Sequence, residues 1–353
     1  SFIASMSGEG NLRVEENLGE GYVRLRVSEA ERRQAKHDIQ HVEDIVIEML
    51  RNARDAGADK VYLATTKEEG VRTLLFLDNG SGVPQDMQER IFDARVTSKL
   101  ESMKMDRWGV HGRGMALFSI KQNTDEARVV TSGVDLGSAF KVCVATDRLG
   151  ERADQSSWPQ AVKDEDGRYV CARGPHNIIR AACEFALEEL RCCDVYLGSP
   201  SEISATLYAQ ASSRLDTSRL LFIDDECELP VIDRLGLASD AEDFIRICSG
   251  LGLEMSERTA HRILSGQIKP VRGVTARLLR ERDSTSHAPA PVDLAKDRRG
   301  LRIAKDDMAQ FSRAVERDFN DLAARYYLNL CGDPKIRVSR DRITVTFDLA
   351  KEE

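Results

Sequence analysis

Residues 42–57 have the sequence VEDIVIEMLRNARDAG, which predicts the helix around which the rest of the fold is built. Glu48, Asn52 and Asp55 stand at i, i+4 and i+7, so their side chains point the same way, about 5 to 6 Å apart between successive Cβ atoms. Taken alone, such a polar row is typical of a solvated helix face. Beside it runs an apolar stripe with helical spacing, made of Val42, Ile45, Val46, Met49, Ala53 and Ala56.

The helical pattern extends back to Ser28, and strand patterns surround it. Alternating or β-branched runs predict strands at 21–27, 61–66, 72–78, 128–132 and 138–146. Residues 1–148 are therefore expected to form one α/β domain, with 1–20 as an N-terminal segment.

The strand at 72–78 ends in Asp78, followed by Asn79-Gly80-Ser81-Gly82. Glycines at this place permit a tight turn and the close approach of a flat ligand. A carboxylate there would accept a hydrogen bond from an exocyclic amine, and an unpaired group in such a pocket costs about 1 to 3 kcal/mol. This is a way to select adenine, although the motif alone is more often a simple turn.

A second glycine-rich stretch, GVHGRG at 109–114, leads directly into the helical pattern MALFSIKQ. Backbone N–H groups before a helix, together with the positive end of its dipole, suit phosphate groups. The stretch matches neither the P-loop spacing, since no Gly-Lys-Ser/Thr closes it, nor the dinucleotide fingerprint, since it does not follow a strand.

In this order, the three stretches resemble the GHKL superfamily of ATPases, which has the Bergerat ATP-binding fold. The similarity covers about residues 20–146 and is greatest to the MutL and type IIB topoisomerase (topoisomerase VI) B-subunit domains. Residues 96–100, VTSKL, look like part of their ATP lid, and 109–120, GVHGRGMALFSI, look like the MutL lid-to-helix run. Arg113 stands where MutL carries an acidic residue, which adds a phosphate donor at this position. The fold implied is an α+β sandwich, a mixed sheet with helices on one face.

The resemblance implies that Glu48 is the general base for the attacking water and that Asn52 ligates Mg²⁺ through its side-chain oxygen. It implies that Asp78 accepts the adenine amine, with an ordered water shared by Thr131. A lid of roughly residues 93–114 would close over the phosphates. The residues assigned to ATP are Asn52, Asp55, Asp78, Gly80, Gly82, Met87, Ser98, Lys99, Gly109, Val110, His111, Gly112, Arg113, Gly114 and Thr131.

Beyond the α/β domain, the polar stretch 149–170 predicts a linker. Residues 171–285 are expected to be mainly helical, and 286–353 a helix followed by a terminal β-hairpin at 335–347. Within 240–282, two helices joined by a glycine-rich turn indicate either a helix-turn-helix or an ordinary helical hairpin with a basic outer face. Gln267-Ile268-Lys269 resembles the family's phosphate-sensing loop, but a plain lysine at a helix end is the alternative.

Charge is unevenly distributed along the chain. Residues 256–348 contain 19 basic against 13 acidic side chains, although the whole chain has a net charge of −8. An anionic partner such as DNA is therefore expected at the C-terminal third, through Arg258, Arg262, Lys269 and Arg272. A solvated surface would show the same balance.

Composition narrows the class of protein. With 41% hydrophobic residues, 9 prolines and 8 cysteines in 353 residues, a wholly disordered or disulfide-stapled chain is excluded. No apolar run approaches a membrane span and the first twelve residues lack a secretory pattern, so a cytoplasmic protein without membrane association is expected.

The function expected is a slow, Mg²⁺-dependent ATPase that acts as a conformational switch or clamp in DNA transactions, dimerising on ATP or working with a partner subunit. One alternative is a regulatory module that binds ATP without hydrolysing it. Another is a protein that acts on polypeptides, like a histidine kinase or a chaperone.

Overall fold

The computed structural model describes residues 14–98, 104–111, 114–215, 225–283, 305–323, 328–332, 334–338 and 343–351. Residues 1–13 of the N-terminal segment and three predicted site residues, Lys99, Gly112 and Arg113, lie outside these ranges. The chain forms two compact units, 1–283 and 284–353.

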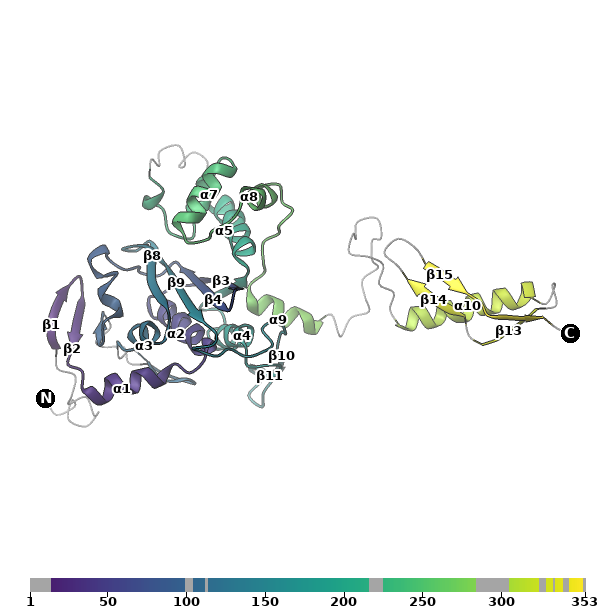
Figure 1. Ribbon diagram of the computed structural model, residues 1–353, viewed down its shortest axis with the longest axis horizontal. Coiled ribbons are helices and arrows are strands. Elements are labelled where there is room, and N and C mark those ends of the chain that lie inside the picture. The colour runs from purple at the N-terminus through teal and green to yellow at the C-terminus, as the bar shows by residue number, and fades with distance from the viewer. Residues whose placement is uncertain are drawn as a thin grey trace. The chain divides into compact units, whose positions relative to one another are not determined.

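A five-stranded mixed sheet forms the centre of the first unit (Figure 1). Its order is β12 (Asp194–Gly198), β3 (Lys60–Glu68), β4 (Val71–Asp78), β9 (Gly137–Ala145) and β8 (Glu126–Gly133). β12 runs parallel to β3, and the other neighbours are antiparallel. The register places Asp78 opposite Val61 on one side and Ser138 on the other.

The helices of the α/β region cover one face of this sheet, as the sequence predicts. They are α2 (Val42–Asp55) and α3 (Ala116–Asn123), and they are joined there by α4 (Ile178–Glu188). The apolar stripe of α2 is buried against the sheet, where Ile45, Val46 and Leu63 share one core. Burying a large aliphatic side chain contributes about 1.5 to 3 kcal/mol, so this stripe fixes the helix on the sheet.

The predicted helix from Ser28 is in fact two helices, α1 (Glu29–Asp38) and α2. Ile39 has extended backbone angles and is buried. Asp44 Oδ2 accepts hydrogen bonds from the backbone N–H groups of Gln40 and His41, both at 2.8 Å. This carboxylate satisfies donors at the start of α2, which helical periodicity alone does not indicate.

The other face of the sheet is covered by the later helices, which Figure 1 shows opposite α2 and α4. They are α5 (Pro200–Arg214), α7 (Ala241–Gly250) and α8 (Glu257–Leu264), with the short 3-10 helices η3 (Glu226–Glu228) and η4 (Arg234–Leu237). A second core joins Tyr62, Leu75 and Leu77 of the sheet to Ile203 and Phe244 of these helices. α9 (Val274–Asp283) packs instead beside α4 and β12.

The region 149–170, expected as a linker, contains strand β10 (Gln160–Lys163) and the first residues of β11 (Tyr169–Arg173), which pair as a hairpin. The Gln155 side chain donates to Glu43 Oε1 of α2 at 2.6 Å and accepts from the backbone of Ile178 in α4 at 3.0 Å. These polar residues thus make specific contacts with two helices, which composition alone does not reveal.

Smaller elements complete the first unit. A three-stranded sheet joins β1 (Val14–Gly19), β2 (Tyr22–Leu25) and β5 (Val96–Thr97). A hairpin is formed by β6 (Lys104–Asp106) and β7 (Gly109–His111). Two 3-10 helices, η1 (Gln85–Met87) and η2 (Arg90–Phe92), lie between β4 and β5 in the chain.

The second unit contains helix α10 (Lys305–Ala323) and two pairs of strands. β14 (Lys335–Val338) pairs with β15 (Ile343–Thr346), within the predicted hairpin, and β13 (Leu328–Leu330) pairs with β16 (Leu349–Lys351). Across the described parts of the chain, none of the helices has the length and apolar character needed to span a bilayer.

Candidate functional site

A cavity of about 570 Å³ lies in the first unit between α2, the sheet and α3. Its walls come from segments that are far apart in the sequence. Among the residues that line it are Glu48, Asn52, Asp55, Asp78, Gly82, Thr97, Ser98, Trp108, Gly114, Ser119 and Ser138.

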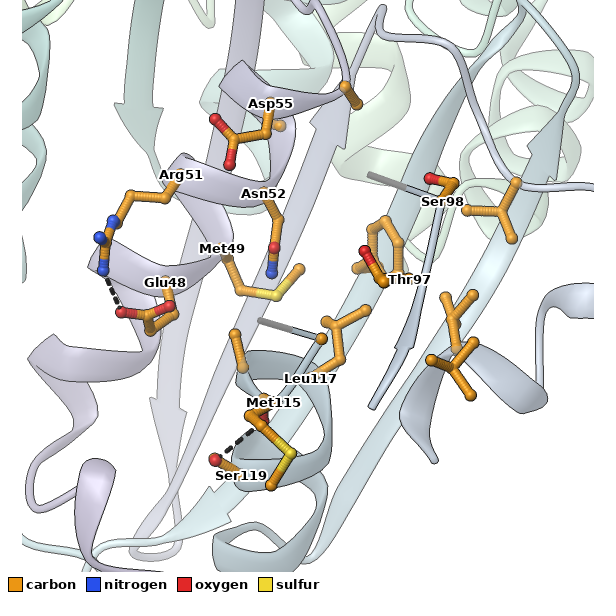
Figure 2. Close-up of a pocket in the computed structure, with 18 of the residues that line it drawn as sticks. Glu48, Met49, Arg51, Asn52, Asp55, Thr97, Ser98, Met115, Leu117 and Ser119 are labelled. Atoms are coloured by element: carbon orange, nitrogen blue, oxygen red, sulfur yellow. Dashed lines mark hydrogen bonds and ion pairs between the residues drawn. The ribbon is translucent and has the colours of Figure 1, made fainter. Parts of the chain in front are cut away.

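The polar row of α2 faces this cavity rather than bulk solvent. Figure 2 shows Asn52 and Asp55 on the same side of the helix, with Met49 beside them. Asn52 Nδ2 is buried and has no hydrogen-bond partner among the described residues. Burying an amide without a partner is costly, so this side chain is placed as a ligand-binding group would be.

Asp78 lies at the end of β4 and is only 4% exposed. Its Oδ1 accepts a hydrogen bond from the backbone N–H of Gly80 at 2.8 Å. Ser138, which lies opposite Asp78 in the sheet, also lines the cavity. A buried carboxylate and a hydroxyl therefore stand together at this wall.

The glycines after Asp78 are required by close packing. Gly82 has φ +70°, and a Cβ built on it would lie 1.8 Å from the carbonyl oxygen of Gly133. Gly80 approaches α2 so closely that its Cβ would be 2.9 Å from Ala56 Cβ. The turn thus lets the chain pass between α2 and the β8–β9 turn, and Gly82 lines the cavity while Gly80 does not.

Two of the residues predicted to hold the phosphates lie at the cavity in the described part of the chain. Gly114, with φ +67°, and Ser98 line it. Gly109, Val110 and His111 form strand β7, and their side chains lie outside the described residues. Gly114 lies two residues before the start of α3, and its carbonyl accepts a hydrogen bond from the backbone N–H of Arg95 at 2.8 Å.

Two predicted site residues lie elsewhere. Met87 is fully buried in the core and does not line the cavity. The Thr131 hydroxyl accepts a hydrogen bond from Arg234 Nη1 at 2.8 Å, and its cross-strand partner Ala139 belongs to the core on the other face of the sheet. A register irregularity between Val129 and Thr131 separates this pair from the ladder before it. Ser138, rather than Thr131, lies beside Asp78.

Lys269, considered as a phosphate sensor, is also remote from the cavity. It is exposed, and Ile268 and Val271 on either side of it pack against the core on the far face of the sheet. The two faces are separated by the sheet itself, so the structure does not bring Lys269 to this site.

The structure adds charged residues that the motifs do not indicate. Arg95 lines the cavity, forms an ion pair with Glu31 of α1, and has a buried Nε without a partner among the described residues. Hydrogen bonds from Ser28 and from Arg95 lower the pKa of Glu31. Tyr22 of β2 lines the same cavity, and burial raises the pKa of its hydroxyl. Pairs such as Glu31 and Arg95 depend on tertiary folding, because 64 positions separate them.

Asp106 accepts hydrogen bonds from two arginines at the edge of the site. Arg51 and Arg54 of α2 both donate to it, and Arg54 also donates to Asp55 at 2.9 Å and to Glu189 at 3.0 Å. These carboxylates raise the pKa of Arg54 against the effect of its burial. Within the ranges that the structure describes, no group of three or more His, Cys, Asp or Glu side chains is arranged to hold a metal ion.

Comparison with known proteins identifies the domain that carries the cavity. Residues 39–140 match the family described as "Histidine kinase-, DNA gyrase B-, and HSP90-like ATPase". The chain is 34% identical over 112 residues to the DNA mismatch repair protein MutL of Brucella abortus (strain S19), which covers 31% of this chain and 18% of that protein. It is 31% identical over 107 residues to MutL of Thermodesulfovibrio yellowstonii, covering 30% of this chain and 19% of that protein.

The chain thus spans about a fifth of the length of the curated relatives that it matches. The matched segment contains α2, the Asp78 turn and Gly114, which are the parts that meet at the cavity. Residues 39–140 therefore form a GHKL-type ATPase domain, of the family that joins histidine kinases, DNA gyrase B and HSP90, and are similar in sequence to MutL.

Proposed function

We propose that this protein binds ATP with Mg²⁺, hydrolyses it slowly, and uses the nucleotide as a conformational switch in DNA transactions. The observation that carries the proposal is that α2, the Asp78 turn and the start of α3 contribute to one cavity in a domain of this family. Its volume of about 570 Å³ is of the size found for small-molecule sites.

The adenine would be selected at the Asp78 wall. A buried carboxylate accepts hydrogen bonds only, so it favours a base with an exocyclic amine. Ser138 would hold a water between Asp78 and the base, the role first expected of Thr131. Asp55 would orient the pocket, and Gly82 leaves room for the flat ring.

The phosphates would lie towards α3, near Ser98 and Gly114, with Lys99 and residues 109–113 as further donors on lid closure. Asn52 would ligate Mg²⁺, since a neutral side-chain oxygen suits this hard cation. The unpaired amide of Asn52 supports this fit, because rotation of the amide presents its oxygen at the same place. A bound Mg²⁺ would neutralise charge on the phosphate oxygens.

Glu48 would be the general base. It is carried by a helix anchored in the core, and its carboxylate lines the cavity with 21% of the side chain exposed. In hydrolysis the carboxylate takes a proton from the attacking water, the new bond forms at the γ-phosphorus, and ADP leaves.

The test is phosphate release by the purified chain with ATP and Mg²⁺, with EDTA as the control. E48A should retain binding of a non-hydrolysable ATP analogue and lose at least about 100-fold in turnover. D78N should weaken analogue binding by about 5- to 150-fold, the equivalent of about 1 to 3 kcal/mol for a mispaired buried group. Normal hydrolysis by E48A would refute the assignment of the base.

The alternatives give different results in the same assays. Analogue binding without phosphate release would indicate a regulatory module that uses ATP only as a ligand. Transfer of labelled phosphate to the protein would favour a kinase, and binding of unfolded polypeptide without DNA would favour a chaperone.

DNA binding is proposed for the surface of α8. Arg258 and Arg262 on this helix are exposed, as are Lys269 and Arg272 beyond it, and none of the four forms an ion pair with another described residue. Ala260 and Ile263 on the opposite side of α8 are buried, so the arginines form the outer face. Two curated relatives are named as DNA mismatch repair proteins, which supports this partner class.

Duplex binding should weaken steeply with salt, and the double variant R258E/R262E should abolish it. Binding that is insensitive to salt, or unchanged in this variant, would exclude the α8 surface. The protein would dimerise on binding ATP or assemble with a partner subunit. It would do so in the cytoplasm. Light scattering with and without the ATP analogue tests the dimer.

A further inference from the structure

Arg51 lies between the proposed base and the β6–β7 hairpin. Its Nη1 donates to Glu48 Oε1 at 2.6 Å, while Nε and Nη2 donate to the two carboxylate oxygens of Asp106, each at 3.0 Å. The Arg51 side chain is 3% exposed and that of Asp106 is 9% exposed. A single guanidinium thus binds two carboxylates from separate parts of the chain.

The geometry of these contacts restricts Glu48. A guanidinium is planar, and two parallel hydrogen bonds to one carboxylate fix its orientation as well as its position. With one edge held by Asp106, Arg51 presents Nη1 to Glu48 in a fixed direction. Figure 2 shows the Glu48 carboxylate turned towards Arg51, with the contact marked by a dashed line.

Asp106 is itself held from several sides. It accepts from the backbone N–H of Trp108 at 3.0 Å and from Arg54 Nη1 at 3.1 Å. Trp108 stacks on Phe185 of α4, with ring centroids 6.3 Å apart, and Arg107 forms an ion pair with Glu184 at 3.2 Å. The hairpin is therefore anchored on α2 and α4, and its position determines where Arg51 is held.

We propose that Arg51 is a positioning residue for hydrolysis, which orients the Glu48 carboxylate towards the attacking water and makes that orientation depend on docking of the β6–β7 hairpin. The inference rests on the proposed ATPase function. Asp106 belongs to the segment 93–114 expected to act as the lid. Docking of this hairpin and alignment of the base are thus one event, transmitted through a single side chain.

The test compares kcat, KM, affinity for a non-hydrolysable ATP analogue, and thermal stability for the full chain and four variants. R51M removes both the charge and the fork, that is, the two parallel hydrogen bonds from the guanidinium to Asp106. R51K keeps the charge without the fork. D106N weakens the fork but leaves Arg51 in place. The matched control is R72M. Arg72 of β4 makes the same kind of buried fork, through Nε and Nη2 to Glu151 at 2.7 and 3.0 Å, and does not line the cavity.

R51M should lower kcat by about 100-fold, the scale of a 1 Å misplacement of a catalytic group, while analogue affinity changes by less than about threefold. R51K should recover part of the loss. D106N should lose about 10-fold in kcat, although it changes neither Glu48 nor Arg51. R72M should lose thermal stability and keep kcat within about twofold of the unmodified chain.

Three outcomes would overturn the inference alone: kcat unchanged in R51M, an equal loss of kcat and analogue affinity, or a loss of kcat in R72M as large as in R51M. Should R51M fail to fold, D106N decides, and normal kcat in D106N refutes the proposal. An unmodified chain that binds the analogue and releases no phosphate would refute the hydrolytic function and this inference together.

Discussion

At the scale of single residues, the turn after Asp78 is limited by the space around its glycines. Gly82 and Gly70 both have positive φ, at +70° and +82°, and differ in their surroundings. A Cβ at Gly82 would collide with the Gly133 carbonyl, whereas one at Gly70 would meet nothing within 4 Å. The two positions therefore separate backbone strain from steric exclusion.

We predict that G70A costs about 1 to 2 kcal/mol of unfolding free energy, from the left-handed backbone alone. G82A should cost about 3 to 5 kcal/mol and weaken binding of the ATP analogue, because the turn must move away from the β8–β9 turn. Urea denaturation measures the difference. Equal losses in both variants would show that packing at Gly82 is not restrictive.

Adjacent cysteines offer a second test at this scale. Cys192 is exposed, whereas Cys193 is buried and burial raises the pKa of its thiol to about 12. Alkylation requires the thiolate, so at pH 8 a thiol with that pKa has only about 1 part in 10⁴ in reactive form. Iodoacetamide should label Cys192 rapidly and leave Cys193 unmodified in the native protein. Mass spectrometry reads the result, and both should react in urea.

At the scale of elements, α4 depends on a buried cap. Asn177 is 0% exposed; its Oδ1 accepts from the backbone N–H of Arg180 at 2.8 Å, and its Nδ2 donates to the carbonyls of Asp154 and Ser157 at 2.9 and 3.0 Å. One amide thus begins the helix and fixes the preceding loop. Because α4 packs against α2, this cap also supports the helix that carries the site.

We predict that N177A destabilises the protein by about 3 kcal/mol, since it removes the cap and takes away the partner of two carbonyls and one backbone N–H. The control is S256A, which removes the exposed cap of α8, where Ser256 Oγ accepts from Thr259 N at 3.4 Å, and should cost about 1 kcal/mol. Chemical denaturation compares the two. Similar losses would mean that water replaces the contacts of Asn177.

At the scale of the whole molecule, the sheet is completed and covered by residues beyond 148. β12 adds the parallel strand beside β3, and α5, α7 and α8 bury one face of the sheet. Tyr62, Leu75 and Leu77 are almost fully buried by these elements. An α/β domain cut at residue 148 would expose this apolar face to water.

We predict that a chain ending at residue 283 unfolds cooperatively and binds the ATP analogue, whereas one ending at 148 aggregates or remains unfolded. Thermal unfolding followed by circular dichroism, together with analogue titration, distinguishes them. A folded, analogue-binding chain ending at 148 would show that the second core is dispensable.

The fold of the ATP-binding domain could be predicted from patterns of neighbouring residues alone. The helical spacing of apolar residues in α2 and their alternation in the strands are both patterns of neighbouring residues. They can therefore be recognised in the sequence alone. The polar row of α2 and the Asp78 turn are equally local, because helical spacing and a strand end place each group on its own element.

Which of these groups meet depends on how distant segments pack. Ser138 rather than Thr131 stands beside Asp78, because a local irregularity in β8 and cross-strand register determine which hydroxyl faces the cavity. Arg51 donates hydrogen bonds to both Glu48 and Asp106, which are separated by 58 positions in the chain. The later helices cover the second face of the sheet. Such pairs form when distant segments pack together. The residues next to a side chain in the sequence do not indicate which distant side chain will be its partner.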